Sequence, residues 1–204
     1  MITIVDYGMG NVGSILNMLK HLGHAACISA QPDDIRHASK LILPGVGAFD
    51  AGMSNLAARG LRQALDEAVC ERQVPVLGIC LGMQLLSRRS EEGLLPGLGW
   101  LDAATVRFHF AATDSGPRIP HMGWNLAIPV RPDPLIAGLE KEARFYFVHS
   151  YHLVCSDPAD ELARTTHGYV FPSIVRRGHI YGTQFHPEKS HRYGMKLLGN
   201  FARL

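Results

Sequence analysis

A cysteine between two closely spaced glycines is the most reactive feature of this sequence. The run Gly78-Ile79-Cys80-Leu81-Gly82 has the spacing of the nucleophile elbow Gly-x-Ser-x-Gly, with cysteine in place of serine. In such an elbow the nucleophile stands on a tight turn between a strand and a helix, and the start of the helix favours the thiolate. The pattern predicts covalent catalysis by Cys80. The alternative is a structural cysteine ahead of a helix, because free cysteine is among the most buried residue types.

A thiol nucleophile needs a base, and the base needs a third group that fixes its tautomer. His186 and Glu188 are two residues apart, and on extended backbone their side chains leave the same face. Pro187 between them fixes φ and stiffens the segment. We therefore predict a triad of Cys80, His186 and Glu188. Taken alone, His186 is one of 11 histidines and is also compatible with a surface position.

The segments that must position these residues have the patterns of parallel strands. Val74 to Ile79 is apolar and rich in β-branched residues, which suits a strand buried on both faces. Lys40 to Leu43 predicts another strand, which ends at Pro44-Gly45-Val46-Gly47. Ligands of open α/β sheets bind at the carboxyl ends of the strands. This loop is therefore a candidate source of an oxyanion-hole N–H beside that of Leu81, although a simple turn is the alternative.

The remaining periodicities predict the α/β class, as one domain over residues 1–204. We expect a mostly parallel central sheet flanked by helices, with an antiparallel β extension in the C-terminal half. Further strands are predicted over 1–7, 25–29, 102–110, 124–130 and 145–151, a hairpin over 173–185, and helices over 11–22, 53–72 and 191–204. Gly60 lies inside the long helix predicted for 53–72 and weakens it.

A glycine-rich motif near the start imitates a dinucleotide-binding fingerprint. The run Gly8-Met9-Gly10-Asn11-Val12-Gly13 is a literal G-x-G-x-x-G between a strand and a helix, and Asp33 and Asp34 follow about 20 residues later. These two acids come after Pro32, however, where they are typical of the first turn of a short helix. We therefore predict a tight turn here and no cofactor.

Composition describes an ordinary globular chain. Of its 204 residues 47% are hydrophobic and 19% charged, with a formal net charge of +2, which favours neither nucleic acid nor a membrane as partner. The start has neither a basic region nor a signal-type apolar region, so we expect a cytoplasmic protein. The cysteines are scattered, which indicates reduced thiols rather than a disulfide framework or a structural metal site: Cys27, Cys70, Cys80 and Cys155.

Three motifs in this order and spacing resemble the class I (triad) glutamine amidotransferases: Pro44-Gly45-Val46-Gly47, Gly78-Ile79-Cys80-Leu81-Gly82-Met83-Gln84 and Gln184-Phe185-His186-Pro187-Glu188. Finer motifs resemble one branch, the glutaminase subunits of imidazole glycerol phosphate synthases in histidine biosynthesis. These are Asp6-Tyr7-Gly8-Met9-Gly10-Asn11, Pro44-Gly45-Val46-Gly47-Ala48-Phe49, Pro120-His121-Met122-Gly123-Trp124-Asn125 and Phe147-Val148-His149-Ser150-Tyr151. The resemblance covers essentially the whole chain.

The resemblance implies a glutaminase with a role for each matched residue. Cys80 would attack the side-chain amide of glutamine, His186 would protonate the leaving ammonia, and Glu188 would orient His186. The oxyanion would be held by the Leu81 N–H and by an N–H of the Gly45-Val46-Gly47 strand, that of Val46 after a peptide flip. The amino-acid end of glutamine would be held by Gln84, by Glu92 as counter-ion of the ammonium, and by the backbone of Ser150 and Tyr151.

The same resemblance implies a partner, since the family passes ammonia to a (β/α)8 cyclase subunit and these 204 residues contain no second catalytic domain. The interface residues it implies are Asn11, His121, Trp124, Tyr146 and Lys189. The chain departs from the family pattern at His152 and in a small polar insert at 111–117, which we expect to be mobile.

Three alternatives remain open at this stage. One is a glutaminase of another amidotransferase, such as the anthranilate synthase or vitamin B6 type. Another is a cysteine hydrolase of the same fold that acts on another substrate. The third is a non-enzymatic docking subunit, which would require a defective triad.

Overall fold

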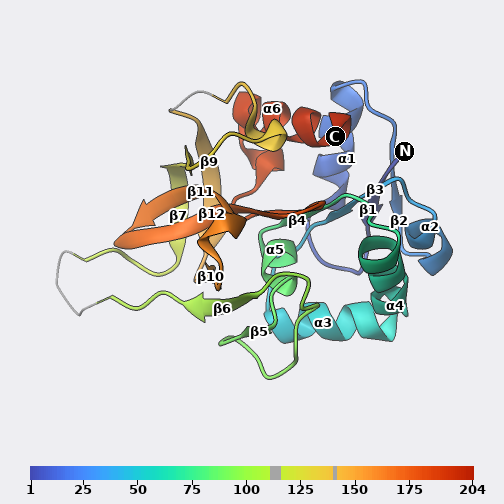
Figure 1. Cartoon of the computed structure of the whole chain (residues 1–204), viewed down its shortest axis with the longest axis horizontal. Helices are drawn as coiled ribbons and strands as arrows, with labels where there is room; N and C mark the ends of the chain where they lie inside the picture. Colours follow the sequence, from blue (N-terminus) through green and yellow to red (C-terminus); the bar gives the residue numbers. More distant parts are fainter. Residues whose placement is uncertain (111–115, 140–141) are drawn as a thin grey trace.

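The carboxyl ends of five parallel strands form the edge of the sheet on which the site is built. In the computed structural model, which describes residues 1–110, 116–139 and 142–204, this sheet has eight strands within the described ranges, in the order β2-β1-β3-β4-β13-β12-β11-β8 (Figure 1). The parallel strands are β1 (Ile2–Val5), β2 (Ala26–Ser29), β3 (Lys40–Leu43), β4 (Val76–Ile79) and β13 (Ile180–Thr183). The antiparallel continuation is β12 (Tyr169–Arg177), β11 (Glu161–His167) and β8 (Ile128–Pro129).

Two smaller sheets accompany the antiparallel half of the main sheet (Figure 1). In the first, β6 (Ala103–Arg107) lies between β10 (Tyr151–Cys155) and β5 (Arg89–Ser90). In the second, β7 (His121–Leu126) pairs antiparallel with β9 (Arg144–His149). The predicted architecture, a mostly parallel sheet flanked by helices with an antiparallel extension, is confirmed.

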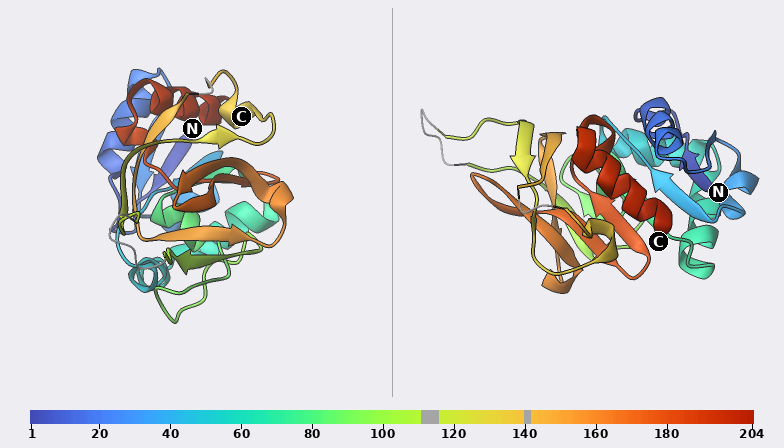
Figure 2. Two further views of the ribbon diagram at one scale, coloured as in Figure 1. Left: turned by 90° about the vertical axis from the view of Figure 1, so that its left-hand side faces the viewer. Right: turned by 90° about the horizontal axis from the view of Figure 1, so that it is seen from above.

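Helices cover both faces of the parallel half (Figure 2). One face carries α1 (Val12–His21) and α6 (His191–Arg203), and the other carries α3 (Phe49–Ala58), α4 (Leu61–Asp66) and α5 (Leu81–Leu85). The remaining helical segments are short: α2 (Pro32–Arg36), the π-helical turn η1 (Glu67–Glu71), and the 3₁₀ turns η2 (Pro134–Ile136), η3 (Pro158–Asp160) and η4 (Pro187–Lys189).

The alternation of side chains along the parallel strands divides the core between these two helical layers. In β3, Leu41 and Leu43 belong to the apolar cluster under α3 to α5, whereas Ile42 points into the cluster under α1 and α6. All three side chains are fully buried. Burial on both faces explains why these strands have nearly continuous apolar sequences.

The single helix predicted for residues 53–72 is wrong. α3 ends at Ala58, and Gly60 takes the left-handed backbone conformation with φ of 66° before α4 begins. Glycine reaches this conformation without steric cost, so Gly60 terminates one helix instead of being tolerated within a longer one. Of the insert expected at 111–117, residues 111–115 lie outside the described residues.

The glycine-rich turn at residues 8–13 has a packing role. Gly8 and Gly10 have positive φ, and a Cβ on Gly10 would come 3.0 Å from the backbone nitrogen of Gly45. Asp33 and Asp34 lie in the first turn of α2, as predicted. In the described part of the chain, no helix combines the length and the apolar character needed to cross a membrane.

Candidate active site

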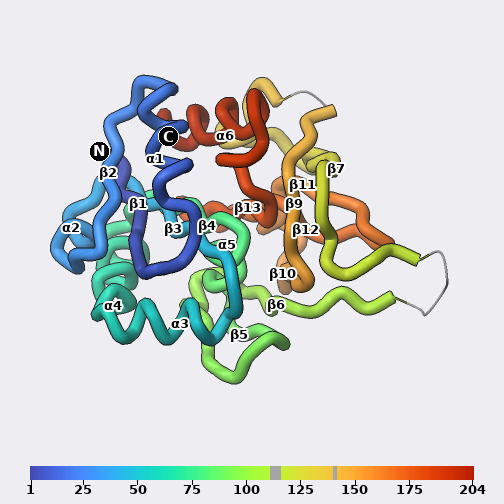
Figure 3. The backbone as a smooth tube through the Cα atoms, turned by 180° about the vertical axis from the view of Figure 1, so that it is seen from behind, coloured from blue at the N-terminus to red at the C-terminus, as the bar shows by residue number. Residues whose placement is uncertain are grey.

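Cys80 occupies a strained turn between β4 and α5. Its φ of 54° and ψ of −109° lie in a region that non-glycine residues rarely adopt, at a cost of about 1–3 kcal/mol. The Cys80 N–H donates to the Thr183 carbonyl at 2.7 Å, which ties the elbow to β13 beside it (Figure 3). The nucleophile elbow predicted from the glycine spacing is therefore present, with the side chain 6% exposed.

Close packing explains the glycines around this turn. A Cβ on Gly82 would lie 1.8 Å from the Leu43 carbonyl oxygen, and one on Gly78 would lie 2.7 Å from the Gly82 oxygen. A Cβ on Gly45 would lie 2.5 Å from the Tyr7 hydroxyl and 2.9 Å from the Leu81 Cβ. Real Cβ atoms do not make such contacts. The loop after β3 can therefore lie against the elbow only because these positions have no side chain.

His186 and Glu188 follow β13, the strand next to the one that carries Cys80. His186 Nδ1 is 2.8 Å from Glu188 Oε1, and both side chains are 2% exposed. The backbone of His186 is fixed from the other side, because its N–H donates to the Tyr146 carbonyl of β9. The structure therefore holds the predicted acid–base pair rigidly beside the elbow.

The surroundings of His186 favour its charged form. Burial lowers the pKa of His186, but the interactions with the Cys80 sulfur and the Glu188 carboxylate outweigh burial and raise it above the usual value. His186 Nε2 is buried and has no partner at ordinary hydrogen-bond geometry among the described residues. The Cys80 sulfur is thus near enough to act on His186, but the two side chains do not form a hydrogen bond of ordinary geometry.

A cavity of about 390 Å³ opens at the sulfur and is large enough for a single amino acid. Most of the residues expected around a substrate line this one cavity: Val46, Gly47, Cys80, Leu81, Gln84, Glu92, Ser150 and Tyr151. Gly45, His186 and Glu188 are not among the residues that line it. A larger hollow of about 730 Å³ lies beside η2 among prolines and aliphatic side chains, away from these residues.

Glu92 and the loop that follows β3 line the same cavity. Glu92 Oε2 accepts the Phe49 N–H at 2.8 Å, at the start of α3. Burial raises the pKa of the Glu92 carboxyl, and nearby Asp50 adds to the effect, while the bond from Phe49 partly opposes it. Val46 is 44% exposed, and Gly47 has a φ of 114°. No described lysine, arginine or histidine forms an ion pair with Glu92, and a half-buried carboxylate of this kind suits an ammonium ligand.

Two buried residues to which the sequence analysis assigned no role, Gln184 and His149, are hydrogen-bonded to residues that line the cavity. Gln84 Nε2 donates to the Tyr151 carbonyl at 3.0 Å and to Gln184 Oε1 at 3.2 Å, and Gln184 Nε2 lies 3.8 Å from the Cys80 sulfur. His149 Nδ1 also bonds the Tyr151 carbonyl, at 2.7 Å. The signal for Gln184 was its place in the His186 motif, two residues before the base.

Four of the five residues expected at a partner interface lie along β7, β9 and the segment after β13, and the fifth, Asn11, precedes α1. Trp124 is 46% exposed and stacks on His191 with 5.3 Å between ring centroids, and the Lys189 ammonium lies 5.7 Å from the centre of the Tyr146 ring. Asn11 is exposed and caps α1. His121, also expected at the interface, lies on β7 with its side chain turned inward. It is 4% exposed and hydrogen-bonds His149 at 2.9 Å, so it supports β7 from within.

Comparison with known proteins agrees with this arrangement. Residues 3–203 match the model of the family described as glutamine amidotransferase class-I. The chain is 50% identical, over 100% of both chains, to a Pseudomonas aeruginosa protein named imidazole glycerol phosphate synthase subunit HisH 2. It is also 50% identical to a Methanococcus maripaludis protein of the same name, over 100% of this chain and 99% of that one.

Solved structures share the fold at lower identity. The PurLQS structure from Thermotoga maritima has a TM-score of 0.74 and 21% identity, covering 99% of this chain and 97% of that chain. A putative GMP synthase subunit from Thermoplasma acidophilum has a TM-score of 0.73 and 21% identity, covering 99% and 92%. At this identity the likeness extends to the fold alone.

Proposed function

Since the chain belongs to the class-I glutamine amidotransferase family, we propose that it is the glutamine-hydrolysing subunit of an imidazole glycerol phosphate synthase. The observation that carries this proposal is the joint placement of a strained cysteine and a buried His–Glu pair on adjacent strands. The 50% identity over the full length to a protein named as such a subunit selects this branch of the family.

In the proposed reaction His186 Nε2 takes the thiol proton, and the Cys80 thiolate attacks the side-chain amide carbon of glutamine. The negative oxygen of the tetrahedral intermediate accepts N–H groups from Leu81 and, once its peptide turns toward the cavity, from Val46. The His186 imidazolium then protonates the leaving nitrogen, so ammonia departs and a thioester remains. Water, deprotonated by His186, hydrolyses the thioester to glutamate and restores the thiol. Glu188 holds the imidazole in position throughout.

The cavity wall is proposed to select the amino-acid end of glutamine. Glu92 pairs with the α-ammonium, while Gln84 and the backbone of Ser150 and Tyr151 fix the remaining polar groups. The Ser150 and Tyr151 carbonyls already accept bonds from Phe108 N–H and from Gln84 and His149 respectively. Their positions are thus set before substrate arrives, which lowers the entropic cost of binding.

The ammonia is proposed to pass to a (β/α)8 cyclase subunit, which incorporates it to form imidazole glycerol phosphate for histidine biosynthesis. The face formed by Trp124, Tyr146, Lys189 and Asn11 is the proposed docking surface, because it adjoins the strands that hold His186. We place the protein in the cytoplasm, where a thiol nucleophile stays reduced.

Replacing the nucleophile tests this division of labour. Cys80→Ala, assayed with the cyclase subunit, should lose glutamine-dependent synthesis and keep synthesis supplied with an ammonium salt. Cys70→Ala is the matched control, since Cys70 is exposed on η1, and should leave both activities intact. Loss of both activities in Cys80→Ala would contradict separate sites for hydrolysis and synthesis. A glutaminase that the cyclase does not stimulate would indicate another amidotransferase branch.

A further inference from the structure

Gln184 is a fully buried polar residue in direct contact with the reactive sulfur. It follows Thr183, whose carbonyl receives the Cys80 N–H, so the backbone fixes the side chain relative to the elbow. Its own N–H donates to the Ser173 carbonyl of β12 at 2.9 Å. A buried amide that is held at both ends in this way has little freedom to turn.

The direction of the hydrogen bonds around Gln184 follows from one backbone carbonyl. The oxygen of Tyr151 can only accept, so the Gln84 side chain must present Nε2 to it. The same Nε2 faces the terminal group of Gln184, which must therefore present Oε1. The Gln184 N–H group is consequently left for the Cys80 sulfur. The Gln184 orientation is thus set by its neighbours and not by an arbitrary choice between oxygen and nitrogen.

The Tyr151 carbonyl also accepts a hydrogen bond from His149, which is itself bonded to a second histidine, His121. His149 Nδ1–H donates to the Tyr151 oxygen, so His149 Nε2 must accept, and it does so from His121 Nδ1–H at 2.9 Å. His121 Nε2 then accepts from Asn125 Nδ2 at 3.0 Å. Burial lowers the pKa of both histidines, which keeps them neutral as this pattern requires. The acceptor on which the orientation of Gln184 depends is thus itself well fixed.

The sulfur has two further polar neighbours that favour opposite protonation states. The Val148 carbonyl lies 3.9 Å away and can accept a bond only from the thiol form. The Gln184 N–H, at 3.8 Å, can donate to either form and binds the negatively charged sulfur more strongly. When the thiol proton moves to His186, the Val148 contact loses its hydrogen and the Gln184 contact becomes charge-assisted.

We propose that Gln184 is a catalytic residue whose side-chain N–H stabilises the Cys80 thiolate, alongside the His186 imidazolium. The value of a stabilised thiolate rests on the proposed glutaminase function. The contact itself can be measured without glutamine or the cyclase, so failure of this inference and failure of the function are distinguishable. Among the described residues, the titratable groups His186 and Tyr7 interact electrostatically with Cys80, and neither is altered in the test below.

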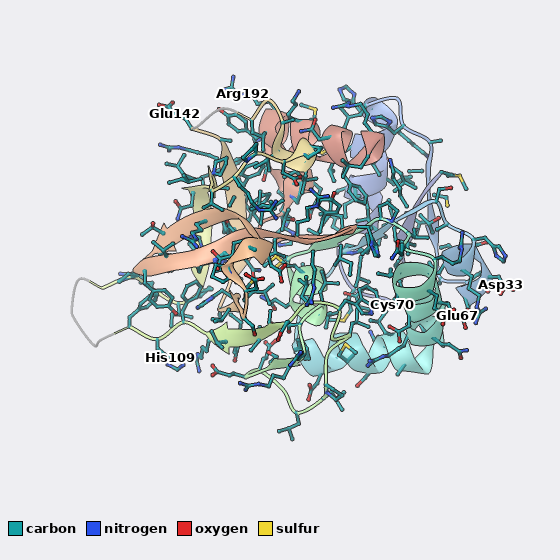
Figure 4. The ribbon with its side chains drawn as sticks, in the orientation of Figure 1. Asp33, Glu67, Cys70, His109, Glu142 and Arg192 are labelled. Atoms are coloured by element: carbon teal, nitrogen blue, oxygen red, sulfur yellow. The ribbon has the colours of Figure 1, made fainter. Side chains whose placement is uncertain are left out.

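The test is alkylation of the isolated full chain by iodoacetamide across a pH series, followed peptide by peptide with mass spectrometry. The thiolate displaces iodide, so the pH midpoint of the alkylation rate reports thiolate formation at Cys80. Gln184→Met preserves length and removes the donor. Its midpoint should rise by about one pH unit, which leaves about tenfold less thiolate below the midpoint. Cys70 lies on the outside near Glu67 and serves as the reference thiol in every sample (Figure 4).

Gln63→Met is the matched control, because Gln63 is exposed on α4 and makes a hydrogen bond to Glu67 only four residues away. It should leave the Cys80 midpoint unchanged. A folded Gln184→Met protein with the wild-type midpoint would overturn the proposal. If Gln184→Met does not fold, nitrogen-15 NMR of the wild type decides. The Gln184 amide proton shift should follow the Cys80 midpoint, and a shift that ignores it would overturn the proposal equally.

Discussion

The site contains two carboxylates in opposite surroundings, those of Glu188 and Glu92. Glu188 has an almost fully buried side chain with His186 as its partner, so its charge holds the imidazole ring and favours the protonated form of that ring. Glu92 is half-buried and its carboxylate accepts a hydrogen bond from the backbone N–H of Phe49 and from no other described residue, so its charge remains available to a ligand. We therefore expect the Glu188 carboxylate to orient the base and the Glu92 carboxylate to bind a positively charged group of the substrate.

Glu92→Gln should raise the KM for glutamine by about 10- to 100-fold with a smaller effect on kcat, because one charge-assisted bond to the ammonium is lost. In the wild type, KM should rise as pH falls. Because burial raises the pKa of the Glu92 carboxyl, this rise should begin at a higher pH than an ordinary glutamate would give. Steady-state kinetics from pH 5 to pH 8 measure both effects.

Glu91→Gln is the natural control for this measurement. Glu91 is the preceding residue, is exposed, and bonds the Arg107 N–H. It should retain the wild-type KM and its pH dependence. If Glu92→Gln also retained them, the ammonium would have to bind elsewhere.

At the scale of elements, the elbow depends on the approach of α5 to the end of β3. Gly82→Ala would place a methyl group 1.8 Å from the Leu43 carbonyl oxygen, and backbone lies on both sides of this contact. We expect a loss of stability of about 1–3 kcal/mol or more and a displaced nucleophile. Urea denaturation measures the first effect, and Cys80 alkylation measures the second.

Gly13→Ala tests the same exchange where space is free. Gly13 lies in α1, and a Cβ there meets no atom within 4 Å. Because alanine is the better helix former, this variant should be more stable than the wild type by about 0.5–1 kcal/mol. Equal stability of the two alanine variants would show that crowding at Gly82 has been overestimated.

Elements with a continuous local signal were predictable from the sequence, and long-range contacts were not. The apolar run before Cys80 and the Asn11 cap identified a strand and a helix within a residue or two of their ends. Gly60 shows the limit, since glycine both tolerates and ends helices, and only the packing of α3 and α4 selects the break. The Gln84–Gln184 bond joins residues 100 positions apart, and nothing local in either segment indicates it.

At the scale of the whole molecule, the outer face of β7 exposes large hydrophobic side chains to solvent. Met122 is 63% exposed and Trp124 46% exposed on neighbouring outward positions of one strand. The indole of Trp124 is held nearly parallel to the His191 ring, with 5° between the planes. A large aromatic side chain that is exposed yet held in place is typical of an interface anchor.

Trp124→Ala should weaken binding of the cyclase subunit by about 2 kcal/mol, or about 30-fold in Kd, because an anchor of this size is removed. Titration of the cyclase against its stimulation of glutamine hydrolysis measures the change. Val154→Ala, on β10 with a similar exposure of 49%, is the control and should bind as the wild type does. Unchanged affinity in Trp124→Ala would move the docking surface away from β7.

The hydrogen bond from the Cys80 N–H to the Thr183 carbonyl fixes the register of β4 against β13. Side chains alternate along extended backbone, so one extra residue inserted between Thr183 and His186 would send the imidazole to the opposite side of the sheet. The Cys80 sulfur would stay in place without a base. The protein could then still react with alkylating reagents, but it would not hydrolyse glutamine. The number of residues between Thr183 and His186 therefore determines whether the base faces the nucleophile, and hence whether the chain can be catalytically active.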